Sequence, residues 1–303
     1  MKKPEKLKVL AFFCLNFFIQ GLCFSQLIFR DTGTKTNPEE LEKMYSGYIA
    51  VKDSLAQKKF NFFYSHILEI ENKKYLLPDG HFNVYEWQGD TWNNIYTGPF
   101  FGYNFYSKKF VHDQKIYSFG GYGYWRNHGQ VIQFIPERGE WELVKFTENL
   151  SNSFAFTTEK GLHLIGKSSK LVDFASKKIR DYPELSIDKN YDPYTQYTTS
   201  LELDSFYLCG IKPHYLIQKY TNDVLITDLQ PFKSLFIALH NPLDFVYTFQ
   251  DTIVVISEQR KIKDTLDVKE HLPFFVPYRD GPPKSIYLWL LAGVLPLGFV
   301  WLK

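Results

Sequence analysis

The chain has 303 residues, of which 45% are hydrophobic and 22% are charged, and this composition excludes wholesale disorder. The formal net charge of +2 lacks the basic excess typical of nucleic-acid-binding proteins, so we expect no nucleic-acid partner. Aromatic residues make up 18% of the chain, a share that favours strands over helices.

The first 25 residues are typical of a secretory signal peptide. Four lysines precede an apolar run over residues 9–19, and Cys23 and Ser25 place small side chains just before Gln26. We therefore predict export with cleavage before Gln26. An uncleaved membrane anchor is the alternative, but an apolar run of about 11 residues is short for a membrane span.

Residues 26–60 form an N-terminal segment with the start signal of a helix. Asn37 is a good helix cap, Pro38 suits the first helical position, and Glu40 completes a capping box. Apolar side chains then recur at helical spacing, at Leu41, Met44, Tyr45 and Tyr48. This pattern predicts a short helix that ends near Gly47.

Residues 111–146 contain the clearest of several internal repeats. An apolar strand at 115–119 runs into two glycines, and two further strands follow at 131–134 and 141–144. Trp141 lies seven residues after Phe134. The order of strand, double glycine, aromatic residue and Trp resembles a kelch repeat. The resemblance implies an all-β fold, a kelch-like β-propeller, in which Trp141 should be largely buried.

Weaker copies of this unit flank it on both sides. Their second strands begin near residues 75, 116, 162, 206 and 252, at steps of 41, 46, 44 and 46 residues. We therefore predict a propeller of five to six blades over residues 61–275. A sixth blade would come from residues 26–60 or from pairing of the two chain ends. A pair of β-sandwiches is the alternative, because it also produces short strands at steady spacing.

The C-terminal end carries a second membrane signal. Residues 286–302 contain no charge, and Tyr287, Trp289 and Trp301 lie near the two ends of the run. We predict a transmembrane helix here, preceded by a linker at 276–285; a buried core helix is the alternative. Together, the two signals predict a propeller outside the cytoplasm, periplasmic or on the cell surface, anchored to the lipid bilayer through 286–302.

The candidate ligand site lies on one face of the expected propeller. The loop after each second strand and the links between blades meet on that face, because antiparallel strands alternate in direction. Aromatic rings beside Arg, Asn and His suit a peptide or a sugar ring, although such rings also fill gaps between blades. The candidates are Tyr103, Tyr122, Tyr124, Trp125, Arg126, Asn127, His128, Tyr194, His214 and Tyr215.

No catalytic motif stands out, and none of the eight histidines has a partner at metal-binding spacing. We therefore expect no catalytic residues, no metal and no cofactor. The favoured function is an extracytoplasmic, membrane-anchored binding module for a protein, a peptide or a glycan. The alternatives are the sensory half of a transmembrane signalling regulator whose cytoplasmic output is missing from this chain, and a glycan-acting enzyme on a kelch-like propeller.

Overall fold

The computed structural model describes most of the region between the two apolar ends. The described residues are 26–31, 35–57, 64–98, 104–123, 126–150, 154–165, 169–182, 200–209, 214–221, 224–227, 244–257 and 262–277. The expected signal peptide and transmembrane helix lie outside them. Among the described helices, none is both long enough and apolar enough to cross a membrane.

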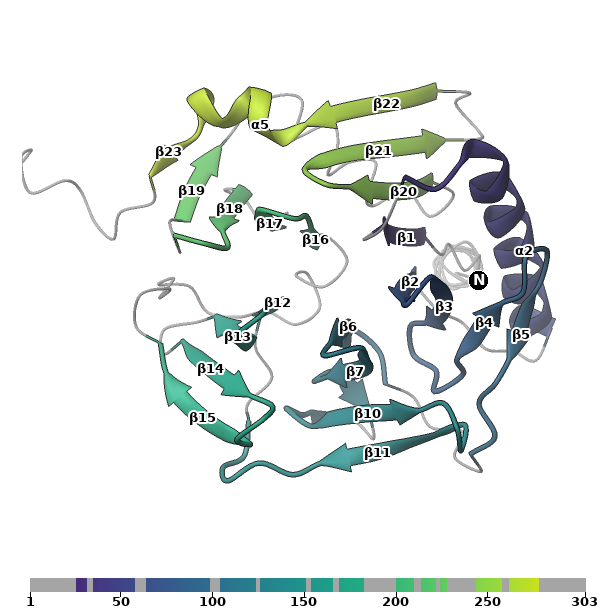
Figure 1. The fold of residues 1–303 in the computed structure, drawn as a ribbon, viewed down its shortest axis with the longest axis horizontal. Helices are drawn as coiled ribbons and strands as arrows, with labels where there is room; N and C mark the ends of the chain where they lie inside the picture. The colour runs from purple at the N-terminus through teal and green to yellow at the C-terminus, as the bar shows by residue number, and fades with distance from the viewer. Residues whose placement is uncertain are drawn as a thin grey trace, which may run out of the picture.

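The described chain is built mainly from consecutive antiparallel strands, which confirms the all-β class. Figure 1 shows the four larger sheets standing around a common centre, with β1, β2, β6, β12 and β16 close to it. Two sheets have four strands each. The first contains β6 (Lys108–His112), β7 (Lys115–Phe119), β10 (Val131–Ile135) and β11 (Glu140–Val144). The second contains β12 (Phe154–Thr158), β13 (Gly161–Ile165), β14 (Lys170–Asp173) and β15 (Lys178–Asp181).

The remaining strands form three further sheets. A five-stranded sheet contains β16 (Ser200–Glu202), β17 (Phe206–Cys209), β18 (His214–Gln218), β19 (Val224–Thr227) and β23 (Val276–Pro277). The largest sheet has eight strands, in the order β22 (Ile262–Asp267), β21 (Thr252–Ser257), β20 (Asp244–Phe249), β1 (Gln26–Asp31), β2 (Tyr64–Ile70), β3 (Lys73–Pro78), β4 (Tyr85–Trp87) and β5 (Trp92–Asn94). A small hairpin pairs β8 (Tyr122–Gly123) with β9 (Arg126–Asn127). Two short helical turns, α5 (Val268–His271) and η3 (Leu272–Phe274), precede β23.

Strand β1 joins the strands β20–β22, from late in the chain, to the strands β2–β5. It runs parallel to β2 on one edge and parallel to β20 on the other, so that Phe29 lies opposite both Ile67 and Tyr247. Neighbouring residues of β1 point to opposite faces of the sheet. Phe29 is fully buried in the cluster beneath the long helix, whereas Ile28 packs in a cluster with Leu201.

The five second strands lie where the sequence pattern predicts them. They are β3, β7, β13, β17 and β21, and each is bonded between the first and third strands of its hairpin series. The two glycines after β7 have φ values of 65° and 111°, a backbone conformation that side chains disfavour. A Cβ at Gly121 would lie 2.2 Å from Oδ1 of Asn104, so close approach also requires glycine there.

The seven-residue spacing between Phe134 and Trp141 has a simple structural cause. The two residues face each other across the β10–β11 hairpin, with ring centroids 5.4 Å apart. Nε1 of Trp141 also donates to the carbonyl of Phe82, at 2.8 Å. Trp141 is partly buried and packs against the apolar cluster that contains Ile116 and Phe134. As part of the outermost strand, β11, it has a neighbouring strand on one side only.

The N-terminal helix is longer than predicted. Helix α2 runs over Pro38–Gln57, whereas the sequence pattern predicted an end near Gly47. The apolar stripe continues past that glycine through the buried Val51 and Leu55. A Cβ at Gly47 would lie 3.0 Å from the ring of Trp92, so this glycine allows an indole to approach the helix and does not end it. Nε1 of Trp92 donates to the carbonyl of Met44, at 3.0 Å.

We therefore predict that Gly47→Leu destabilises the protein although it raises helix propensity. The added side chain would displace the Trp92 ring, and such overpacking costs about 2 kcal/mol of unfolding free energy. Ser46→Leu is the matched control, because Ser46 is exposed on the same helix and should change stability by less than about 0.5 kcal/mol. Denaturant unfolding measures both variants. Equal effects would show that the Trp92 contact does not constrain the helix.

Candidate functional site

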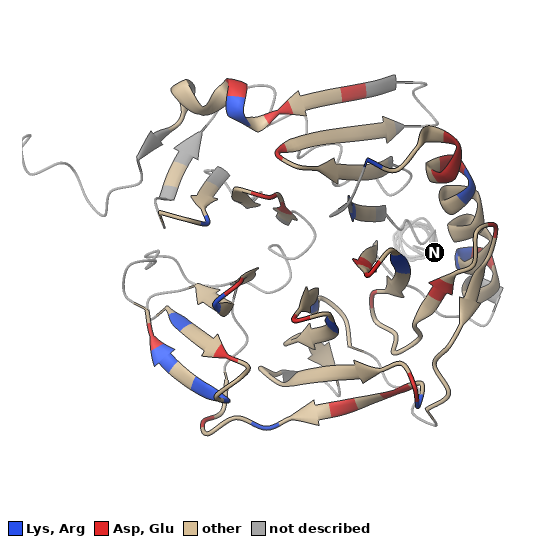
Figure 2. Cartoon of the chain, viewed as in Figure 1, with Lys and Arg blue, Asp and Glu red and all other residues tan. Residues whose placement is uncertain are grey.

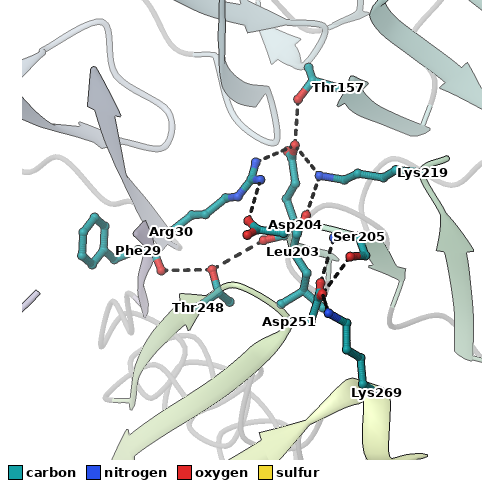
Figure 3. Close-up of polar contacts among 11 residues, drawn as sticks. Phe29, Arg30, Thr157, Leu203, Asp204, Ser205, Lys219, Thr248, Asp251 and Lys269 are labelled. Carbon is teal, nitrogen blue, oxygen red and sulfur yellow. Dashed lines mark hydrogen bonds and ion pairs between the residues drawn. The ribbon is translucent and has the colours of Figure 1, made fainter. Parts of the chain in front are cut away.

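A buried carboxylate lies where several sheets meet at the centre of the fold. Glu202 ends β16, and its side chain is 12% exposed. Its Oε1 accepts hydrogen bonds from Nη1 of Arg30 at 2.9 Å, from Nζ of Lys219 at 3.1 Å and from Oγ1 of Thr157 at 2.8 Å (Figure 3). Nζ of Lys108 lies 3.6 Å from Oε2. One carboxylate therefore holds three cations and a hydroxyl.

These partners come from strands that are far apart in the sequence. Arg30 lies on β1, Lys108 on β6 and Thr157 on β12, and Lys219 directly follows β18. The strands β1, β6, β12 and β16 all lie close to the centre in Figure 1. Their charged side chains can therefore meet although Arg30 and Glu202 are 172 residues apart. We call Arg30, Lys108, Thr157, Glu202 and Lys219 the central cluster.

A second carboxylate tethers the hairpin turns beside this cluster. Oδ1 of Asp251 accepts from the amide of Ser205 at 2.8 Å, and its Oδ2 accepts from Oγ of Ser205 at 2.8 Å and from Nζ of Lys269 at 2.9 Å (Figure 3). Asp204 directly precedes Ser205 in the chain, and its Oδ1 lies 3.3 Å from Nη2 of Arg30. The β16–β17 turn is thus fixed to the neighbouring sheet from two directions.

Electrostatics hold Glu202 in its charged form. Burial raises its pKa, but the nearby cations Lys219, Arg30 and Lys108 outweigh burial and hold the pKa well below its usual range. Burial lowers the pKa of Lys219 to about 8, and this effect is opposed by Glu202 but reinforced by Arg30. At neutral pH the central cluster therefore contains three cations around one fully ionised carboxylate.

Two cavities adjoin the central cluster and share Arg30, Thr157 and Glu202 in their walls. The smaller has a volume of about 310 Å³ and is also lined by His66, Lys108 and Lys109. The larger has a volume of about 520 Å³, of the size that small-molecule ligands occupy. Its other lining residues include Lys160, His163, Tyr182, Lys219 and Tyr220.

Two histidines and another buried lysine of these cavity walls, Lys109, also have shifted pKa values. Burial, followed by the charges of Lys108 and Lys109, lowers the pKa of His66 to about 3, and burial lowers that of His163 to about 4. Both imidazoles are therefore neutral at pH 7. Burial lowers the pKa of Lys109 to about 8; its Nζ donates to the hydroxyls of Ser107 and Ser118.

The described residues of the loop site predicted from the sequence, Tyr122 and His128, do not line these two cavities. Tyr122 belongs to β8, and His128 follows β9, where its Nε2 is 3.0 Å from Oδ1 of Asn104. Their loop joins β7 to β10, at the opposite end of the sheet from the β6–β7 turn that lines the larger cavity through Asp113. Tyr103, Tyr124, Trp125 and Tyr194 lie outside the described residues, as do the side chains of Arg126, Asn127, His214 and Tyr215. The loop site stays a prediction.

The sequence analysis did not identify the central cluster. A usable signal was present in the short first strands, where single charges interrupt apolar residues, as in Leu201-Glu202-Leu203 and Phe29-Arg30. A lone charge on a strand that packs on both faces needs a buried partner. The partner's identity could not be read from the sequence, because it lies on another sheet. Among the described residues, no group of three or more His, Cys, Asp and Glu could hold a metal.

Comparisons with known proteins add little to this geometry. No protein-family model matches the chain, and no curated protein matches it. One similar solved structure is described as "Structure of YjhT", with a TM-score of 0.42 and 9% sequence identity over 63% of this chain and 71% of that chain. A similarity of this size supports no conclusion about function.

We predict that Glu202→Gln destabilises the fold strongly. Removing this charge leaves Arg30, Lys108 and Lys219 buried without their shared counter-charge, which costs about 3 kcal/mol or more of unfolding free energy at pH 7. Glu142→Gln is the control. Glu142 pairs with Arg138, and both side chains are more than half exposed. The loss of unfolding free energy should therefore stay below about 0.5 kcal/mol.

Acid titration adds a second readout of the same variant. The folded-state pKa of Glu202 lies below its ordinary value of 4.5, so its contribution is complete above that pH and is lost as the pH falls toward the folded pKa. The wild-type protein should therefore lose stability in this window more steeply than Glu202→Gln does. Parallel acid profiles would mean that Glu202 is not held in its charged form.

Proposed function

We propose that the chain is a kelch-like β-propeller that serves as a binding module for a peptide, a protein or a glycan. The regular step of the second strands, the radial placement of the sheets in Figure 1 and the Phe134–Trp141 pair all support this architecture. On this proposal there are five blades. The region where a sixth would stand contains β1 and, outside it, α2.

The observation that carries the binding role is the pair of cavities at the centre. Their walls draw polar side chains from the first strands of several sheets, including Arg30, Lys108, Thr157, Glu202 and Thr248. Side chains placed on strands are held more precisely than side chains on loops, and precise placement favours specific binding. Tyr182 and Tyr220 add aromatic surface on which a sugar ring or a peptide side chain could stack.

Export and anchoring form a separate part of the proposal. They rest on the signal-like residues 1–25 and on the apolar run at 286–302. Deleting residues 285–303 should move the protein from the membrane fraction to the soluble exported fraction. Retention of the truncated, signal-processed protein in the membrane would contradict anchoring by this run.

The binding role is tested with glycan and peptide arrays probed by the full chain in detergent. For any ligand found, Tyr220→Ala should weaken binding by about 1–2 kcal/mol without lowering the melting temperature, because this ring is 81% exposed and lines the larger cavity. Leu143→Ala is the control: this side chain is also exposed, at 51%, but it lies on the outermost strand β11.

A ligand found on the arrays also distinguishes the central cavities from the loop site that the sequence predicts. If Trp125→Ala and Arg126→Ala weaken binding and Tyr220→Ala does not, the ligand occupies the loops that the sequence analysis favoured, and the central placement is wrong. If a full array gives no ligand at all, the binding-module proposal fails.

A further inference from the structure

The walls of the central cavities contain more buried positive charge than buried negative charge. The side chains of Lys108 and Lys219 are each 7% exposed, and that of Arg30 is 30% exposed. Among the described residues, Glu202 is the carboxylate that all three cations share. Glu69 adds a second, half-buried carboxylate to the wall of the smaller cavity. Asp204, the other acidic partner of Arg30, is 47% exposed and therefore offers only a water-screened charge.

The hydrogen-bond donors of Arg30 and Lys219 also exceed their acceptors among the described residues. A guanidinium has five N–H groups. For Arg30, the described acceptors are Glu202 at Nη1 and Asp204 at Nη2, and its buried Nε has no partner among the described residues. An ammonium has three N–H groups. For Lys219, the described acceptors are Oε1 of Glu202 and the carbonyl of Leu203. Both side chains line the larger cavity, from which a further acceptor could reach them.

Stability alone does not explain this arrangement. Buried ion pairs often contribute less than apolar side chains of the same volume, because the charges lose their hydration. Three cations around one carboxylate also repel one another, and this repulsion contributes to the lowered pKa of Lys219. An additional anion in the cavity would relieve the repulsion and use the spare donors.

Acidic residues at the rim limit what such an anion can be. Asp113 and Glu159 belong to exposed turns that line the larger cavity, and Figure 2 shows acidic segments at the inner hairpin turns around the centre. A polyanion would be repelled by these turns, whereas a small group with one anionic end can pass them and reach the buried cations. Lys160 lines the same cavity and partly offsets the acidic charge of the rim.

We infer that the central cavities bind a small ligand with a single oxyanion group, a carboxylate or a phosphate-like group, held by Arg30 and Lys219. The inference rests on the proposed binding function and specifies its ligand class. The oxyanion lies beside Glu202, where the guanidinium and the ammonium supply charge-assisted hydrogen bonds. The remainder of the ligand lies in the larger cavity against Tyr182 and Tyr220.

The test is calorimetric titration of the folded full chain in detergent with acetate, lactate, inorganic phosphate and sulfate. Chloride at matched ionic strength serves as the reference. We expect saturable binding of at least one oxyanion, and the carboxylate and phosphate arms identify which group the site prefers. Lys219→Gln should weaken that binding about tenfold or more, as the loss of a charge-assisted hydrogen bond implies.

Two further variants keep the inference falsifiable if Lys219→Gln fails to fold. Lys160→Glu reverses an exposed charge at the cavity without entering the core and should weaken oxyanion binding severalfold. Lys43→Gln, the control, removes an exposed cation that pairs with Glu39 on α2 and should bind as wild type does.

Two results would overturn the inference. The first is the absence of saturable oxyanion binding above the chloride reference, and the second is unchanged affinity in both Lys219→Gln and Lys160→Glu. If an array ligand still binds and no oxyanion competes with it, the binding module stands and the oxyanion inference falls. If neither an array ligand nor an oxyanion binds, both fall.

Discussion

The pairing of β1 with β2 and β20 is the constraint on which the rest of the structure depends. Residues 26–31 are bonded on both edges, so this strand connects sheet elements that are separated by most of the chain. Alternate side chains then serve different purposes. Phe29 packs beneath α2, whereas Ile28 and Arg30 face the centre, where Arg30 meets Glu202. If β1 is misplaced, the apolar core beneath the helix and the central cluster are both lost.

The central cluster and the apolar clusters stabilise the fold in different ways. Leu201, Phe206 and Val246 fill the space between the five-stranded and eight-stranded sheets without demanding a unique geometry. Glu202 does demand one, because it must meet three hydrogen-bond donors and a further cation, Lys108, from four other places in the chain. Such a cluster adds little net stability, because its charges lose their hydration on burial. The proposed binding role would account for its presence.

The local features of the fold could be predicted from the sequence, and the contacts between sheets could not. The second strands, the glycine turn after β7 and the Phe134–Trp141 pair depend on residues close together in the chain. The same seven-residue spacing between Tyr85 and Trp92 has a different outcome, because Trp92 lies opposite Trp87. Gly47 looked like a helix end because the ring that packs on it lies 45 residues further along the chain.

The candidate site was missed for the same reason. Aromatic loops stand out in a sequence, whereas Arg30, Lys108 and Glu202 are ordinary charged residues until the fold brings their strands together. Lys108 begins β6, Glu202 ends β16 and Arg30 is the last residue but one of β1. Only the arrangement of the sheets shows that these strand ends converge.

Native-state hydrogen exchange on the β1 amides tests the central role of this strand most directly. If β1 holds β2 and β20 together, the amides of Leu27 to Arg30 that bond to these two strands should exchange only through global unfolding. Their opening free energy should then match the unfolding free energy measured with denaturant. Exchange of these amides at a much lower free energy, with the other strands still protected, would show that β1 detaches on its own and that the fold does not depend on it.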